Sequence, residues 1–181
     1  MGKNLLIEVG LEEIPARFLN DIIEDFKNNF KNFLDKENIL YKNIERYATP
    51  RRLVIFVTDI SPYQQNRVIK IKGPKRTIAF STSSEPTSAL IGFMEKNGGK
   101  LEELKFEKVG KDEYVFIEKN VEGKMSKEII EKGFNDVLFS IPIKKPMRWD
   151  NITFIRPIRW ILALIDDEVL KIKIGNVESK N

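Results

Sequence analysis

Cysteine and histidine are both absent from the 181 residues of this chain. Without cysteine the chain can form no disulfide, thiolate zinc site or cysteine nucleophile. Without histidine it lacks the side chain that most often moves protons near neutral pH. Any catalytic site would therefore depend on carboxylates, lysine, tyrosine or hydroxyl groups.

Long apolar runs are also missing. The run at residues 161–165 is among the longest, and it is far shorter than the roughly 20 residues needed to cross a bilayer. The first residues lead directly into a strand-like segment, without the apolar region and small-residue cleavage site of a signal peptide. We therefore expect a cytoplasmic protein with no membrane partner.

The phosphate-binding glycine loops GxxxxGK[ST] and GxGxxG do not occur, which argues against the common nucleotide-binding folds. Hydrophobic residues make up 41% and charged residues 32% of the chain, as in an ordinary folded domain. The net charge of +4 favours a nucleic-acid partner only weakly.

Three segments predict amphipathic helices. Apolar residues recur every three or four positions from about Pro15 to Lys36, as on the core-facing side of a helix. A second helix is predicted from residues 84–86 to a glycine pair at 98–99. Ser126 can cap a third, which carries apolar residues on one face and ends before Pro142.

The predicted strands are short and lie between the helices. Residues 68–72 are expected to pair with the apolar strand 53–57, to end at Gly73-Pro74, and to be followed by a polar loop at 75–84. No regular strand–helix–strand rhythm is present, so we predict an α+β fold with a mixed, mainly antiparallel sheet and about three helices. Two lobes, about 1–62 and 63–181, are possible within it. The other strands are predicted at 4–9, 44–48, 106–109 and 114–118 (a hairpin), and 158–165 and 169–174 (joined at 166–167).

Five of the nine arginines fall in two short segments, 48–53 and 146–160, and the second also holds both tryptophans. The planar guanidinium group binds phosphate oxygens bidentately, and an indole stacks on bases. These segments supply the candidate residues for contact with RNA or a protein partner: Arg51, Arg52, Arg148, Trp149, Arg156 and Arg159, with Lys72, Lys75 and Arg76 as weaker candidates on the loop.

A structural role for the same residues stays open. Arginine and tryptophan also dominate protein–protein contacts, the arginines can pair internally with Glu12, Glu13 or Asp150, and Trp160 is expected in the core. Glu12 and Glu13 are expected to complement a helix dipole rather than act as an acid/base pair. Residues 166–168 are expected to form a tight turn rather than bind a cation. An editing or hydrolytic domain would need converging acids, of which the sequence gives no sign.

Several blocks in the right order make the sequence similar to a known family. The chain resembles the N-terminal part of the bacterial glycyl-tRNA synthetase beta subunit across nearly its whole length. It departs from the family pattern at Leu11, where threonine is usual, and at Ser81–Ser84, where an acidic loop with glycine is usual. The matching blocks are LLIEVGLEEIPARFL, ATPRRL, KGP, PTSALIGFMEKNGG, EYVF, KKPMRWD and FIRPIRWILALIDDEV.

The resemblance implies a specific biological role. The family's enzyme joins glycine to tRNA(Gly) with ATP and Mg²⁺, and its alpha subunit carries the catalytic core. The beta subunit serves tRNA recognition and the heterotetramer, and it continues into HD-type and anticodon-binding-type domains. The chain is thus expected to be the N-terminal module of that subunit, to bind no cofactor or metal, and to be inactive alone. The alternative is a purely structural packing module without direct tRNA contact.

Overall fold

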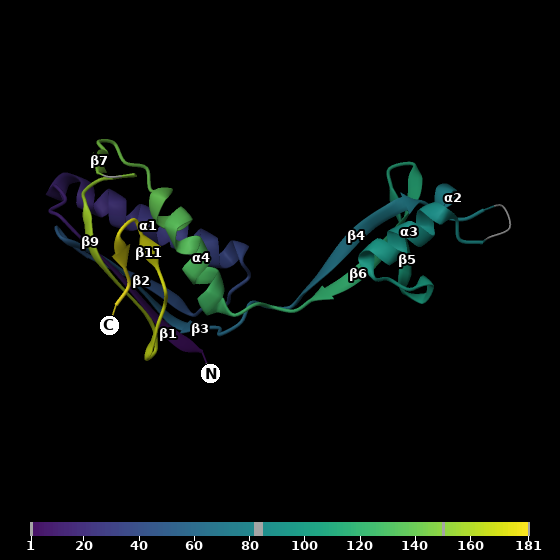
Figure 1. Ribbon diagram of the computed structural model, residues 1–181, viewed down its shortest axis with the longest axis horizontal. Helices are drawn as coiled ribbons and strands as arrows, with labels where there is room; N and C mark the ends of the chain where they lie inside the picture. Colours follow the sequence, from purple (N-terminus) through teal and green to yellow (C-terminus); the bar gives the residue numbers. More distant parts are fainter. Residues whose placement is uncertain (1, 82–84, 150, 181) are drawn as a thin grey trace. The chain divides into compact units, whose positions relative to one another are not determined.

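The computed structural model describes residues 2–81, 85–149 and 151–180 (Figure 1). The chain divides into two compact units. Unit 1 comprises Met1–Gln65 and Gly123–Asn181, and unit 2 comprises Asn66–Glu122. This division differs from the expected lobes 1–62 and 63–181, because the chain returns to unit 1 after residue 122. Helices and antiparallel sheets occur in both units, so the predicted α+β class is confirmed.

Unit 1 is built on a five-stranded antiparallel sheet with the order β10-β9-β1-β3-β2. The first strand of the chain therefore lies at the centre, paired with β3 on one side and with the distant β9 on the other. The strands are β1 (Lys3–Leu11), β2 (Asn43–Thr49), β3 (Arg52–Ile60), β9 (Ile158–Ile165) and β10 (Glu168–Val169).

Two helices, α1 (Ala16–Lys36) and α4 (Ser126–Phe139), bury their apolar residues in the same core as one face of this sheet. The predicted stripe of α1 is confirmed, since its buried residues recur every three or four positions. Phe26 of α1 meets Phe134 of α4 edge to face, with ring centroids 6.0 Å apart. The two helices and the sheet therefore share one hydrophobic core.

The prediction that Ser126 caps α4 is wrong. The capping position is Met125, and the Ser126 side chain is 1% exposed. Its hydroxyl group donates a 2.6 Å hydrogen bond to the backbone carbonyl of Ser61. The serine therefore joins the start of α4 to the segment after β3 instead of satisfying the helix end.

The C-terminal part of unit 1 contains two short hairpins. One is formed by β7 (Met147–Trp149) and β8 (Ile152–Phe154), the other by β11 (Lys173–Ile174) and β12 (Val177–Glu178). The predicted strand 169–174 is thus interrupted, because residues 170–172 belong to no strand in the described part of the chain, although the backbone N–H of Leu170 still donates to the carbonyl of Ala163 in β9 at 2.9 Å. The alternation that predicted it is nevertheless present, since Leu170, Ile172 and Ile174 are all buried.

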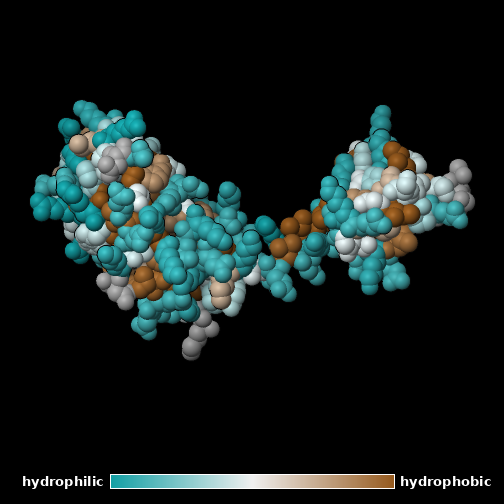
Figure 2. Space-filling view, in the orientation of Figure 1, coloured by the Kyte–Doolittle hydropathy of each residue, from teal (hydrophilic) through white to brown (hydrophobic). Residues whose placement is uncertain are grey.

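Unit 2 is a three-stranded antiparallel sheet with the order β4-β6-β5, covered by short helices. Its small core contains Ala79, Leu90 and Val115. Exposed Val68 and Ile69 belong to the β4–β6 ribbon, on which Figure 2 shows apolar atoms in brown. The elements are β4 (Arg67–Lys75), β5 (Leu104–Val109), β6 (Asp112–Val121), α2 (Arg76–Ala79), α3 (Ser88–Asn97) and the 3-10 turn η1 (Leu101–Glu103).

Three predictions for unit 2 are wrong. Strand β4 pairs with β6 and not with β3. It continues through Gly73-Pro74, where the register shifts instead of ending, and the expected loop 75–84 contains α2. Part of that expected loop, residues 82–84, lies outside the described residues. The predicted hairpin at Gly110 is confirmed, since Val109 pairs with Asp112. Among the described residues, no helix is long and apolar enough to cross a membrane.

Candidate functional site

The two arginine-bearing segments meet at the end of β1. The backbone N–H of Leu11 donates to the carbonyl of Arg51 at 3.1 Å, and that of Ile14 donates to the carbonyl of Pro50 at 2.7 Å. From the other side, the N–H of Glu12 donates to the carbonyl of Pro157 at 3.0 Å. Segments that are about 100 residues apart in the sequence are therefore held together by the short stretch 11–14.

Three of the candidate arginines are exposed and paired with acids of β1 or its continuation. Arg159 forms an ion pair with Glu12. The Nη2 atom of Arg51 lies 3.6 Å from the Oε2 atom of Glu13. The Nη1 atom of Arg52 lies 3.8 Å from the Oε2 atom of Glu8. The side chains of Arg51, Arg52 and Arg159 are 76%, 53% and 64% exposed. Such exposed pairs contribute about 0–1 kcal/mol, so a phosphate group can compete for each guanidinium.

The prediction that Glu12 and Glu13 complement the dipole of α1 is wrong. Helix α1 begins at Ala16 and has no acidic residue in its first turn. Both carboxylates face the arginines instead, which confirms the alternative expectation that they pair internally. The third acid named there, Asp150, lies outside the described residues.

Arg156 differs from the exposed arginines, because its guanidinium is used to hold backbone in place. Its Nε donates to the carbonyl of Glu13 at 2.9 Å, and its Nη1 donates to the carbonyl of Ile155 at 2.8 Å. Nη1 also lies 3.2 Å from the sulfur of Met147. The residue is only partly exposed. Arg156 therefore fixes the position of the acidic stretch beside it.

Arg148 and Trp149 lie on β7, next to Met147. Arg148 is exposed, and no ion pair involves it among the described residues. Trp149, the residue expected to stack on a base, is partly buried and packs against the main core. Arg148 is thus available to an external anion, whereas most of the Trp149 ring faces the protein.

Trp160 is not in the core, contrary to the prediction. It is 39% exposed, and its indole covers Gly10 on the neighbouring strand: a β-carbon at Gly10 would lie 2.0 Å from the Cε2 atom of Trp160. The guanidinium carbon of Arg52 lies 5.4 Å from the ring centroid, a cation–π contact. A glycine inside a strand indicates close approach of another group, and this signal could have identified the position.

The weaker candidates Lys72, Lys75 and Arg76 all lie in unit 2. Lys75 is 2.6 Å from Asp112, and this hydrogen bond raises the pKa of the lysine. Arg76 is 2.7 Å from Glu113. The Lys72 ammonium lies 3.6 Å from the ring centroid of Tyr114. Each of these cations has a partner within unit 2, so they form a group separate from the arginines of unit 1.

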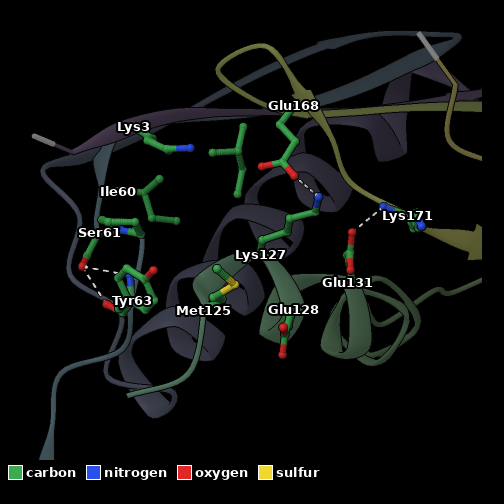
Figure 3. Close-up of a pocket in the computed structure, with 12 residues that line it drawn as sticks. Lys3, Ile60, Ser61, Tyr63, Met125, Lys127, Glu128, Glu131, Glu168 and Lys171 are labelled. Atoms are coloured by element: carbon green, nitrogen blue, oxygen red, sulfur yellow. Dashed lines mark hydrogen bonds and ion pairs between the residues drawn. The ribbon is translucent and has the colours of Figure 1, made fainter. Parts of the chain in front are cut away.

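A pocket of about 460 Å³ lies in unit 1 between α4, β10 and the segment after β3 (Figure 3). Three lysines and three glutamates line it, so the charges balance. The bond between Lys127 and Glu168 raises the pKa of the lysine and lowers that of the carboxyl. Glu131 accepts a 2.7 Å bond from the backbone N–H of Lys171. The lining therefore carries no net charge that would select a ligand of one sign.

No group of acids that could hold a metal ion is present in the described part of the chain. The acidic residues 166–168 form the predicted tight turn, since Ile165 pairs with Glu168 and Asp166 has a φ of 49°.

Comparisons with known proteins agree on one family. The profile described as "Glycyl-tRNA synthetase beta subunit" matches residues 5–181. The glycine–tRNA ligase beta subunit of Aquifex aeolicus is 39% identical over 100% of this chain. Those of Clostridioides difficile and Bacillus subtilis are 36% and 37% identical over 100% and 98% of it.

The chain spans about a quarter of the length of these relatives: 27% of the Aquifex and Clostridioides proteins and 26% of the Bacillus protein. The match corresponds to their N-terminal part. Because the family profile and the relatives both cover nearly the whole chain, the chain belongs to the glycyl-tRNA synthetase beta subunit family.

Proposed function

We propose that this chain is the tRNA-recognition and assembly module of a glycyl-tRNA synthetase, which attaches glycine to tRNA(Gly) with ATP. Its partners are tRNA(Gly) and the alpha subunit, its place is the cytoplasm, and ATP and Mg²⁺ are used by the alpha subunit. Family membership supports the reaction. The absence of cysteine and histidine from the sequence supports a non-catalytic role for this part.

The observation that carries the tRNA role is the group of exposed arginines at the end of β1. Arg51, Arg52 and Arg159 present more than half of their side-chain surface to solvent. Arg148 adds a fourth exposed guanidinium on β7. The ion pairs of these four arginines involve three glutamates in the described residues, so the four residues keep a positive excess. We call these four residues the arginine group, and we assign them to phosphate contact.

A second candidate function is interdomain or intersubunit packing without tRNA contact. The three contacts of Arg156 with main-chain carbonyls and a thioether favour it, since they stabilise the fold whether or not RNA is bound. Under this alternative the remaining arginines serve only to hold Glu8, Glu12 and Glu13.

The variants Arg159→Gln and Glu12→Gln separate the two functions, because they break the same ion pair from opposite sides. If Arg159 contacts phosphate, Arg159→Gln should weaken tRNA(Gly) binding several-fold and reduce the salt slope by about 1. Glu12→Gln should strengthen binding, because it releases Arg159. A purely structural pair predicts no change in tRNA affinity for either variant.

Lys173→Gln is the matched control, because Lys173 is also 64% exposed and paired, with Glu178 at 2.8 Å. It removes the same charge from unit 1 outside the arginine group. In the assembled synthetase, Arg148→Ala with Arg159→Ala should reduce tRNA charging and leave glycyl-adenylate formation unchanged. Equal tRNA affinity for all variants at every salt concentration would contradict the proposal that these arginines contact tRNA.

A further inference from the structure

The five-stranded sheet of unit 1 has a second face, opposite the one that packs on α1 and α4. Side chains alternate between the two faces of a strand, so the cross-strand register defines rows of neighbours on it. One row runs from β2 to β10 through Glu45, Phe56, Leu6, Leu164 and Val169.

The adjacent row on the same face runs through Tyr47, Val54, Glu8 and Leu162. We call these two rows the open face. The next row contains Arg52, Gly10 and Trp160 and belongs to the arginine site. The open face is therefore contiguous with that site but consists of different residues.

Most residues of the open face are hydrophobic, although solvent reaches this face. Seven of its nine residues are hydrophobic, whereas a solvated face of an antiparallel sheet is usually polar. The strands LVIFV and WILALI read as nearly continuous apolar runs, which is typical of strands covered on both faces. The core cluster that includes α1 and α4 contains Leu5 and Ile7 but, among the described residues, not Leu6, Phe56 or Leu164.

The surface of the open face is hollowed rather than flat. A cavity of about 380 Å³ lies there and extends to Arg52 of the next row; its lining from the open face is Leu6, Glu8, Tyr47, Val54 and Phe56. Tyr47, one of the lining residues, has 56% of its surface exposed. A hollow of this size accepts a leucine or phenylalanine side chain from a partner, which is the typical anchor of a protein–protein contact.

The charges on the open face favour a basic partner. The Glu8 side chain is 18% exposed, and the 3.8 Å distance to Arg52 exceeds an ordinary hydrogen bond. Glu8 therefore retains acceptor capacity for a second cation. Glu45, the other acid, accepts a bond from the Tyr47 hydroxyl. The carboxylates of Glu8 and Glu45 repel phosphate groups, which disfavours RNA on these two rows.

We propose that the open face docks an amphipathic helix of the alpha subunit, with an aliphatic stripe over Leu6, Phe56 and Leu164 and a lysine or arginine opposite Glu8. A helix is about 10–12 Å across, which covers two to three strands spaced about 4.8 Å apart. The inference rests on the proposed assembly with the alpha subunit and adds the surface and the chemistry of the contact.

Titration of this chain with the purified alpha subunit tests the proposal by calorimetry. The variant Leu162→Thr with Leu164→Thr removes the apolar side chains but introduces β-branched strand formers on β9, and Glu8→Gln removes the charge of Glu8. Each should weaken binding by about tenfold, as expected for central contact residues. Leu40→Thr is the matched control, because Leu40 is 55% exposed and lies outside the open face. Its affinity should equal that of the parent.

A crosslinking measurement covers the case in which a β9 variant misfolds. The photoreactive residue p-benzoylphenylalanine in place of Tyr47 exchanges one aromatic side chain for another and leaves the other residues of the two rows unchanged. It should crosslink to a helical, lysine- or arginine-containing peptide of the alpha subunit. If the open-face variants bind the alpha subunit with the affinity of the parent, and no crosslink to the alpha subunit forms, the docking site is wrong. The proposed assembly with the alpha subunit would still stand. A crosslink to tRNA or to a second copy of the chain would also overturn the docking site. No binding of the alpha subunit to the parent would overturn both proposals.

Discussion

Gly10 and Trp160 are cross-strand neighbours, and the indole occupies the space that a β-carbon at position 10 would need. The glycine is thus required by its neighbour rather than by its own backbone conformation. The contact also places the Trp160 ring beside Arg52, whose guanidinium carbon lies 5.4 Å from the ring centroid.

The substitution Gly10→Ala should displace the Trp160 ring and destabilise unit 1 by about 1–3 kcal/mol, the usual cost of overpacking. Urea unfolding measures the free energy, and tryptophan fluorescence reports the moved indole. In a Trp160→Ala background the same substitution should cost much less, because the clash is gone. An equal cost in both backgrounds would contradict this account.

The edge-to-face contact of Phe26 with Phe134 lies at the centre of the shared core. Because Phe26 is fully buried, Phe26→Ala should lower the free energy of unfolding by about 3–5 kcal/mol. Phe139→Ala is the control on α4, since Phe139 is 40% exposed and should lose less. Thermal unfolding followed by circular dichroism compares them, and similar losses would argue against the observed core.

Tyr41 should be the source of a stability change at high pH. Burial, followed by its 2.9 Å hydrogen bond to Asp35, raises its pKa to about 12. A folded-state pKa above the ordinary value of 10 stabilises the protein below about pH 10, and this contribution is lost as the pH rises toward 12.

Tyrosinate absorbance and urea unfolding between pH 9 and about 12 test this assignment. The parent should lose stability relative to Tyr41→Phe across that interval, and Asp35→Asn should move the Tyr41 titration toward its ordinary pKa. A constant difference between parent and Tyr41→Phe across the interval would show that Tyr41 titrates normally.

Unit 2 should be removable without unfolding unit 1. The two chain crossings lie side by side, since Tyr63 bridges to Met125 and the N–H of Gln64 donates to the carbonyl of Lys124 at 2.9 Å. Replacing Asn66–Glu122 by an Asn-Gly turn suits such antiparallel neighbours. The shortened chain should keep a cooperative unfolding transition.

The same deletion tests the weaker site candidates, because Lys72, Lys75 and Arg76 are removed with unit 2. If the arginine group carries the tRNA contact, the shortened chain should bind tRNA(Gly) with an affinity close to that of the parent. Loss of tRNA binding with a folded unit 1 would move the contact to unit 2.

Local patterns predicted much of this fold. The stripe of α1 and the turns at Gly110 and Asp166 depend on neighbouring residues in the sequence, and all three are confirmed. The partner of β4 was predicted wrongly, because periodicity identifies a strand but not the strand beside it. Ser126 was misassigned for a similar reason: its acceptor, Ser61, is 65 residues away.

The sequence predicted which residues belong to the candidate site, but it did not predict how they are arranged in space. Composition identified the arginines, and their possible pairing with Glu12 and Glu13 was expected. Whether Trp160 faces solvent depends on which side of β9 packs on the helices, and the apolar run around Trp160 hides that choice. The open face was missed for the same reason, since a run of apolar residues does not reveal how many of its sides are covered.

The central place of β1 sets an order of events during synthesis. Its second neighbour, β9, is made about 100 residues after β3, which takes roughly 5–20 s at ordinary translation rates. During that time one edge of an apolar strand has no partner, which is a hazard for aggregation. All strand pairs of unit 2 lie within residues 66–122, so unit 2 can fold in this interval while unit 1 waits for β9. A nascent chain stalled before residue 158 therefore exposes one unpaired edge of β1 to other chains.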